Sequence, residues 1–163
     1  MHFIFLYSRF ADYFYKSLLD LLSDNKRITA HIVRYQQDKN APFVFDETNN
    51  LKLYNYDDFS SKNELLNFII ELGPKLIYVS GWSNKNYNYV VSKFYNQFPT
   101  IVGLDNPWEG KLRQYLGIFY YRIFMKSYFS HIWVAGKPHY KFARYLGFKQ
   151  DKILNDLYRF LKK

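Results

Sequence analysis

The sequence predicts an α/β protein: a Rossmann-like, doubly wound sheet of about six mainly parallel strands with helices on both faces. Two observations support this fold class. Short uncharged apolar segments alternate along the 163 residues with longer amphipathic segments, which is typical of buried parallel strands joined by helical crossovers. The composition, 48% hydrophobic and 23% charged with seven Gly and five Pro, is that of one globular domain.

The first elements follow from hydrophobic periodicity. Residues 3–7 form a short apolar run of strand type, and residues 28–35 form a second strand rich in β-branched side chains. Between them, residues 11–22 place apolar side chains at helical spacing. Residues 36–50 are expected to be mainly loop, with residues 43–45 pairing with a strand over 51–56 around a turn.

Capping signals mark the next helix. Ser61-Lys-Asn-Glu64 has the form of a capping box, and it opens a helix that ends at Leu72. Gly73-Pro74 stops this helix, because proline cannot continue it. The alternation then continues through strands over 76–79, 100–104 and 132–135 and helices over 86–97, 108–126 and 138–146.

Ligands of such sheets bind beyond the carboxyl ends of the strands, and this position nominates candidate site residues. They are Ser8, Arg9, Gly81, Trp82, Ser83, Asp105, Asn106, Trp108 and Lys137. Trp82 either offers a flat apolar face to a sugar ring or lipid, or packs in the core. Asp105 either acts on a ligand hydroxyl as hydrogen-bond acceptor or base, or it caps the following helix, as Asn106 also could.

Several common chemistries lack their motifs. The turn after the first strand is Tyr7-Ser-Arg-Phe-Ala-Asp12, without the G-x-G-x-x-G of a dinucleotide site, and neither a P-loop nor G-x-S-x-G occurs. The chain has no Cys, and its four His lack the spacing of a helical metal site. We therefore expect no cofactor and no metal in this chain. Signatures of RNA-binding and helix-turn-helix domains are absent too, so no nucleic-acid partner is expected.

Positive charge concentrates in the last third of the chain. The net charge is +9, and +7 of it lies within residues 108–149, where Glu109 is the one acidic residue. The predicted helix over 108–126 has one apolar stripe at Leu112, Tyr115, Leu116, Phe119, Tyr120 and Ile123, a second at Ile118, Tyr121 and Met125, and flanking Lys111, Arg113, Arg122 and Lys126. Such a helix is either buried or interfacial, and its basic rim favours an anionic membrane surface.

Four segments carry a resemblance to a known family. They are Lys75-Leu-Ile-Tyr-Val-Ser-Gly-Trp82, Thr100-Ile-Val-Gly-Leu-Asp-Asn-Pro-Trp-Glu-Gly-Lys-Leu-Arg-Gln114, His131-Ile-Trp-Val-Ala-Gly136 and Tyr145-Leu-Gly-Phe-Lys-Gln-Asp-Lys-Ile-Leu154. Together they resemble the N-terminal half of a GT-B glycosyltransferase of the bacterial group-1 type (family 4), which builds surface polysaccharides. The chain departs from many relatives at Tyr7-Ser8-Arg9, where they have glycine, and at Asp105, where they have histidine.

The resemblance implies a two-domain enzyme of which residues 1–154 are the acceptor-binding domain and residues 155–163 begin the interdomain linker or form a tail. The nucleotide-sugar donor would bind a C-terminal domain with an E-x7-E motif, which this chain lacks. This chain alone is therefore expected to be inactive. Its expected partners are that donor-binding domain or subunit, a saccharide or lipid-linked acceptor, and the anionic inner face of the membrane, where a cytoplasmic, peripheral protein would lie.

Within this picture each candidate residue has an expected role. Asp105 would act on the acceptor hydroxyl, and Trp82 and Trp108 would be apolar walls beside the acceptor contacts Ser8, Gly81, Ser83 and Asn106. Phosphate groups or the membrane would meet Arg9, Lys111, Arg113, Arg122, Lys126 and Lys137. Two alternatives stay open: a non-catalytic interaction subunit of a two-chain glycosyltransferase, and, given 22% aromatic residues and the basic charge, a nucleic-acid-binding domain.

Overall fold

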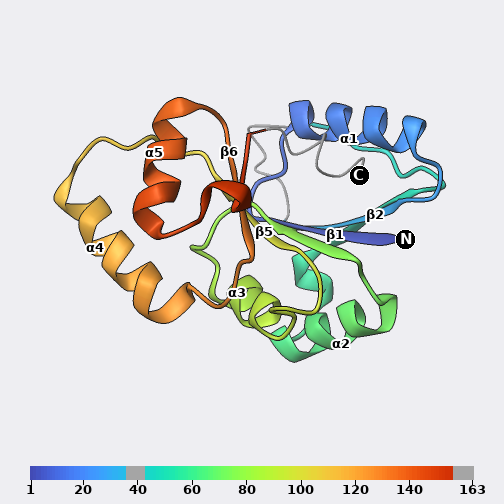
Figure 1. Ribbon diagram of the computed structural model, residues 1–163. Coiled ribbons are helices and arrows are strands. Elements are labelled where there is room, and N and C mark those ends of the chain that lie inside the picture. Colours follow the sequence, from blue (N-terminus) through green and yellow to red (C-terminus); the bar gives the residue numbers. More distant parts are fainter. Residues whose placement is uncertain (36–42, 156–163) are drawn as a thin grey trace.

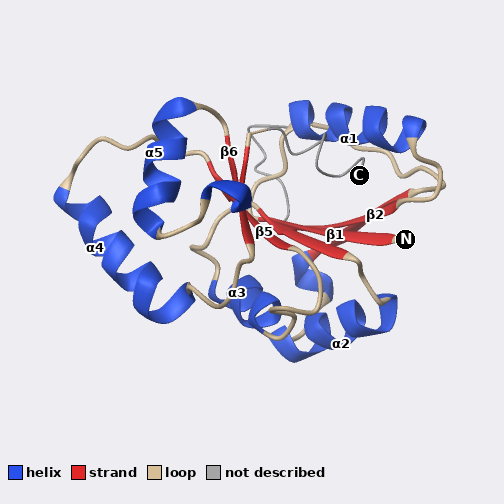
Figure 2. Cartoon of the chain, viewed as in Figure 1, coloured by secondary structure: helices blue, strands red, loops and turns tan. Residues whose placement is uncertain are grey.

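The computed structural model describes residues 1–35 and 43–155 and confirms the α/β class. The described residues form a sheet of seven strands in the order β3-β2-β1-β4-β5-β6-β7, with every neighbouring pair parallel (Figures 1 and 2). Chain order reverses between β1 and β4, which makes that gap the topological switch point. The strands are β1 (His2–Tyr7), β2 (Thr29–Arg34), β3 (Leu51–Asn55), β4 (Leu76–Val79), β5 (Thr100–Leu104), β6 (His131–Val134) and β7 (Ile153–Leu154).

Helices cover both faces of the sheet. On one face, α1 packs against side chains such as Phe5, Ile32 and Tyr78. The opposite face packs against α2, α3, α5 and the π-helical segment η2, which continues α4. The helices are α1 (Asp12–Asp24), α2 (Lys62–Leu72), α3 (Lys85–Ser92), α4 (Leu112–Tyr120), η2 (Tyr121–Met125) and α5 (Lys137–Leu146), with short 3₁₀ turns at Tyr56–Asp58 and Gln150–Lys152.

The capping signals of α2 are confirmed with one change of partner. Ser61 Oγ accepts the amide hydrogen of Glu64, at 3.2 Å between N and Oγ. The Glu64 carboxylate accepts from Ser60 N at 2.7 Å rather than from Ser61. Hydrogen bonds from the Ser60 hydroxyl and from the Ser60 amide lower the pKa of Glu64. Gly73 ends the helix with a left-handed φ of 57°, a conformation that favours glycine.

The expected pairing of residues 43–45 with the following strand is wrong. β3 pairs with β2 instead, in parallel, from Ala30 opposite Leu51 to Arg34 opposite Asn55. Phe45 is buried at the start of α1, with its ring centroid 4.9 Å from those of Phe10, just before the helix, and Tyr15, in its first turn. Phe45 is therefore buried in the core on the α1 face of the sheet and does not pair in a hairpin with β3.

Helix ends and the sheet edge also differ from expectation. Helix α3 ends at Ser92 instead of continuing to residue 97, and β7 is a seventh strand that the sequence did not predict. Helix α4 begins at Leu112, four residues later than expected, because Gly110 adopts a left-handed φ of 72°. The Gln114 side chain closes this start: its Oε1 accepts from Glu109 N at 2.9 Å, and its Nε2 donates to Pro107 O at 2.7 Å.

Two further expectations concern the ends of the domain and the membrane. Residues 156–163, nearly all of the expected linker or tail, lie outside the described residues. No helix in the described part of the chain is long and apolar enough to cross a bilayer.

Candidate functional site

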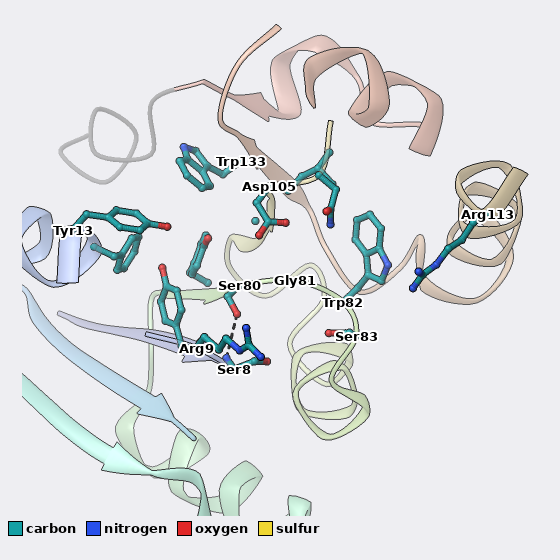
Figure 3. A pocket seen from close by; sticks show the side chains of 16 residues that line it. Ser8, Arg9, Tyr13, Ser80, Gly81, Trp82, Ser83, Asp105, Arg113 and Trp133 are labelled. Atoms are coloured by element: carbon teal, nitrogen blue, oxygen red, sulfur yellow. Dashed lines mark hydrogen bonds between the residues drawn. The ribbon is translucent and has the colours of Figure 1, made fainter. Parts of the chain in front are cut away.

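A cavity of about 460 Å³ lies at the carboxyl ends of β1, β4 and β5, across the switch point of the sheet (Figure 3). Eight of the nominated residues line it: Ser8, Arg9, Gly81, Trp82, Ser83, Asp105, Asn106 and Arg113. Residues that the sequence did not nominate complete the lining: Tyr7, Tyr13, Phe14, Tyr78, Ser80, Gly103, Leu104 and Trp133. The position agrees with the general rule for open α/β sheets.

Asp105 is an exposed side chain that Figure 3 shows in the cavity, above Ser80 and between Trp133 and Trp82. It does not cap α4, whose N-cap residue is Lys111. Its backbone carbonyl is held by His139 Nε2 of α5 at 2.9 Å. Among the described residues, no cation or donor bonds its carboxylate, so both oxygens are open to a ligand. The capping alternative for Asp105 and Asn106 is thereby excluded.

The loops after β1 and β4 are tied together at the cavity floor. Ser8 N donates to Ser80 Oγ at 3.3 Å, and Ser80 N donates to Leu6 O at 3.0 Å. Figure 3 shows the Arg9 side chain beside this bond, and Arg9 is exposed, with no ion pair among the described residues. Arg9 therefore offers an open guanidinium within the same cavity as the Asp105 carboxylate.

The loop of residues 80–84 is anchored from below by α3. The buried Tyr87 hydroxyl donates to Tyr7 O at 3.2 Å, and burial raises the pKa of Tyr87 far above its ordinary value. Asn84 caps α3 and donates from Nδ2 to the Tyr35 hydroxyl at 2.8 Å. These bonds fix the loop that carries Gly81, Trp82 and Ser83 to the ends of β1 and β2.

Trp82 combines the two roles left open for it. Its ring packs on Tyr121 and Phe142, with centroids 5.4 Å and 6.2 Å away, while its remaining surface lines the cavity. A Cβ added at Gly81 would meet no atom within 4 Å. The fold itself therefore does not require glycine at this position, and the space beside it is open to a ligand.

The opposite wall of the cavity is aromatic and comes from the α1 side. Phe14 stacks on Tyr78, with ring centroids 5.7 Å apart, and Trp133 meets Tyr78 edge-on at 6.5 Å. Gly103 makes this wall possible, because a Cβ there would collide with the Tyr78 hydroxyl. Tyr78, Gly103 and Trp133 lie inside strands and Phe14 lies in α1, so the rule of inspecting strand ends missed them. A glycine within an apolar strand was the available signal.

The remaining nominated residues, Trp108, Lys111, Arg122, Lys126 and Lys137, do not line the cavity. Trp108 packs instead between α4 and α5, with its ring centroid 4.6 Å from that of Tyr145 and 5.1 Å from that of Tyr115. Lys111 forms an exposed ion pair with Glu109 at 2.6 Å. Of the nominated basic residues on or next to α4, Arg113 is therefore the one that lines the cavity.

Within the described chain, the structure brings no three His, Cys, Asp or Glu side chains together in a metal-binding group. The cavity instead combines a carboxylate, two guanidinium groups, serine hydroxyls and indole faces. Such a lining can hydrogen-bond hydroxyls, stack on a sugar ring and pair with phosphate. Comparisons with models of protein families, with curated proteins and with solved structures find no match to this chain.

Proposed function

We propose that the chain is the acceptor-binding domain of a GT-B glycosyltransferase, which takes a sugar from a nucleotide-sugar and adds it to a lipid-linked saccharide for surface polysaccharide. One observation carries the proposal: the open carboxylate of Asp105 shares a cavity at the switch point with Arg9, serine hydroxyls and Trp82. A hydroxyl acceptor needs a group that accepts its proton or hydrogen bond. The segment resemblance supports the same assignment.

Each side of the cavity has a role in this proposal. The acceptor hydroxyl lies against the Asp105 carboxylate, and the sugar ring lies on Trp82 with Ser8, Ser83 and Asn106 as hydrogen-bond partners. Arg9 and Arg113 pair with phosphate of the acceptor, because a guanidinium forms bidentate bonds with phosphate oxygens. The position of Trp108 outside the cavity removes it from the acceptor wall.

The donor is proposed to bind a second domain or subunit, at the inner face of a membrane. Much of the rate of a two-substrate reaction comes from holding both reactants in place, and this cavity carries neither a glycine-rich phosphate loop nor an acidic pair. We therefore expect nucleotide-sugars to bind this chain no better than about millimolar, and the chain alone to transfer no sugar. Isothermal titration with a nucleotide-sugar panel tests this, and a micromolar dissociation constant would assign the donor site to this chain.

The acceptor site is tested by titrating the chain with saccharides that carry a short-chain diphospho-lipid, and with the same saccharides lacking it. We expect the diphospho compounds to bind more tightly and Asp105→Asn and Arg9→Gln each to weaken binding at least about tenfold, the loss of one charge-assisted bond. Asp20→Asn, an exposed acidic residue of α1 that does not line the cavity, is the matched control. Wild-type affinity in both cavity variants would contradict the proposal.

When a donor-binding domain is supplied, Asp105→Asn should lower the transfer rate by about 10² to 10⁴ if the carboxylate is the general base. The melting temperature should stay nearly unchanged, because the side chain caps no helix. Wild-type turnover of this variant would exclude Asp105 from the chemistry. Transfer that needs a separately supplied chain would favour the two-chain form of the enzyme.

A further inference from the structure

Helix α4 and η2 carry a continuous row of large apolar side chains on their outer surface. Leu112, Leu116, Phe119 and Ile123 recur at i, i+4, i+7 and i+11, the spacing of one helix face. Tyr115, Tyr120 and Phe124 flank them, and all seven side chains are between 53% and 75% exposed. We call these seven residues the outer stripe. A patch of this kind on a helix marks an interaction surface.

The helix is well anchored on its other side. Tyr121 and Met125 are 1% and 2% exposed, and the ring of Tyr121 lies 5.4 Å from Trp82 and 5.7 Å from Phe148. The second apolar stripe of the sequence is therefore in the core, and the outer stripe is left over after packing. The outer stripe is therefore exposed in the folded structure.

The charged side chains that α4 and η2 carry around the outer stripe are all basic. Arg113, Arg122 and Lys126 are exposed along it, and from Gly110 to Gln150 the sequence contains no acidic residue. Basic side chains close to an anionic bilayer are attracted to its negative surface potential. Leu, Ile and Phe in the middle with Tyr at the sides is also the arrangement of interfacial helices.

We infer that the outer stripe docks on an anionic lipid bilayer. A second copy of the chain fits less well, because a two-fold contact of this face would set its basic residues against themselves. A bilayer needs no shape complementarity, and it takes up an apolar row with a basic rim at the depth of its headgroups.

Docking has a consequence for the cavity, and this step rests on the proposed function. Arg113 belongs to the first turn of α4 and also lines the cavity, where Figure 3 shows it facing Trp82. A bilayer on the outer stripe therefore lies at the Arg113 side of the cavity mouth. A phosphate at headgroup level would meet Arg113 while the saccharide attached to it reaches Asp105.

Docking is tested by flotation of the chain with vesicles of phosphatidylcholine, with and without phosphatidylglycerol. We expect binding only to the anionic vesicles, and loss of binding at 1 M salt, where the screening length is about 3 Å. Leu116→Ser with Phe119→Ser, and separately Arg113→Gln with Arg122→Gln and Lys126→Gln, should each lower the bound fraction at least about tenfold. Exposed residues elsewhere give the matched controls: Ile70→Ser for the apolar pair, and Lys26→Gln with Arg27→Gln and Lys75→Gln for the basic set.

The chain has no cysteine, so single-cysteine variants give a direct readout of orientation. A polarity-sensitive fluorophore at Phe119→Cys should shift to the blue with anionic vesicles, and one at Ile70→Cys should not. A label at Ser83→Cys, on the cavity rim, should be quenched by headgroup quenchers and not by acyl-chain quenchers. An unquenched label at this position would overturn the placement of the cavity at the headgroups.

Other outcomes overturn the docking itself. Equal binding to neutral vesicles would remove the anionic requirement. Absence of vesicle binding, with a concentration-dependent dimer that Leu116→Ser and Phe119→Ser abolish, would assign the stripe to a self-contact. The flotation assay uses no saccharide, and the saccharide titration uses no lipid bilayer. Failure of one proposal is therefore distinguishable from failure of the other.

Discussion

Helices α1 and α4 hold similar places in the fold, but α1 exposes its polar face to the solvent and α4 exposes an apolar face. Each follows a strand whose carboxyl end lines the cavity, β1 for α1 and β5 for α4, and each is amphipathic. Helix α1 buries Phe14, Leu18, Leu21 and Leu22 against the sheet. Helix α4 buries none of its residues, and its large apolar side chains are exposed.

The difference shows what amphipathic spacing can and cannot identify. An apolar face predicts that something covers it, but the spacing is the same whether the cover is a sheet or an external partner. The distinguishing signs in α4 are its second apolar stripe, which Tyr121 and Met125 extend into the core, and its basic flanks. In α1 the first turn is acidic, and Asp12 pairs with Lys16 at 2.6 Å.

The largest expected effect compares the same substitution in the two helices. Leu18→Ala in α1 should lower the free energy of unfolding by about 2–5 kcal/mol, because Leu18 is 0% exposed and the change leaves a cavity. Leu116→Ala in α4, where the side chain is 62% exposed, should change it by less than about 0.5 kcal/mol. Urea denaturation measures both. Equal losses would mean that the outer stripe is packed in the isolated chain.

A pH effect is expected from the face of the sheet opposite α1. Burial, together with His2 and Lys52, lowers the pKa of His31 from 6.5 to about 4, and its ring nitrogens bond His2 at 2.9 Å and the Tyr54 hydroxyl at 3.1 Å. The unfolded chain takes up the proton first, so stability should fall as pH drops from about 6.5 to about 4, by up to about 3 kcal/mol.

Unfolding at a series of pH values measures this slope. His31→Gln should flatten it. A slope unchanged by His31→Gln would show that other groups, such as the partly buried His131, whose pKa burial also lowers, carry the acid sensitivity.

Two glycines extend the comparison, one in the packed core beside α1 and one in the exposed helix α4. Gly103→Ala should cost about 1–3 kcal/mol, because its Cβ would push the Tyr78 ring out of the aromatic wall shared with α1. Gly117→Ala in α4 meets no atom within 4 Å, and it should raise stability by about 0.5–1 kcal/mol through helix propensity. Thermal melts of the two variants should move in opposite directions. A shift of the same sign in both would contradict the open surface of α4.

The smallest expected effect concerns local opening. Backbone amides of α1 should exchange hydrogen more slowly than those of α4, because α1 is held by buried side chains and α4 mainly through η2 and Trp108. Anionic vesicles should slow exchange in α4 and leave α1 unchanged. Hydrogen exchange with mass spectrometry resolves the two helices. Protection of both helices to the same degree would indicate a general effect of the vesicles.

Much of the fold was predictable because its helices and strands depend on interactions between residues close together in the sequence. Apolar runs such as residues 76–79 and capping signals such as Ser61 and Gly73 act within a few residues, so the sequence alone predicted the doubly wound sheet. The strand-end rule then placed Ser8, Arg9, Gly81, Trp82, Ser83, Asp105 and Asn106 at one edge. Topology brings these residues together whatever their side-chain contacts are.

Only the tertiary structure decided which partners those elements meet. The late start of α4, the packing of Trp108 between α4 and α5, and the contact of Tyr78 with Gly103 depend on segments far apart in the sequence. The same holds for the two apolar stripes of the helix over α4 and η2. Only the packing of the folded domain shows that the stripe with Tyr121 and Met125 is buried and that the outer stripe is exposed. Local periodicity determines that a face is apolar, and non-local packing determines whether the protein itself buries it.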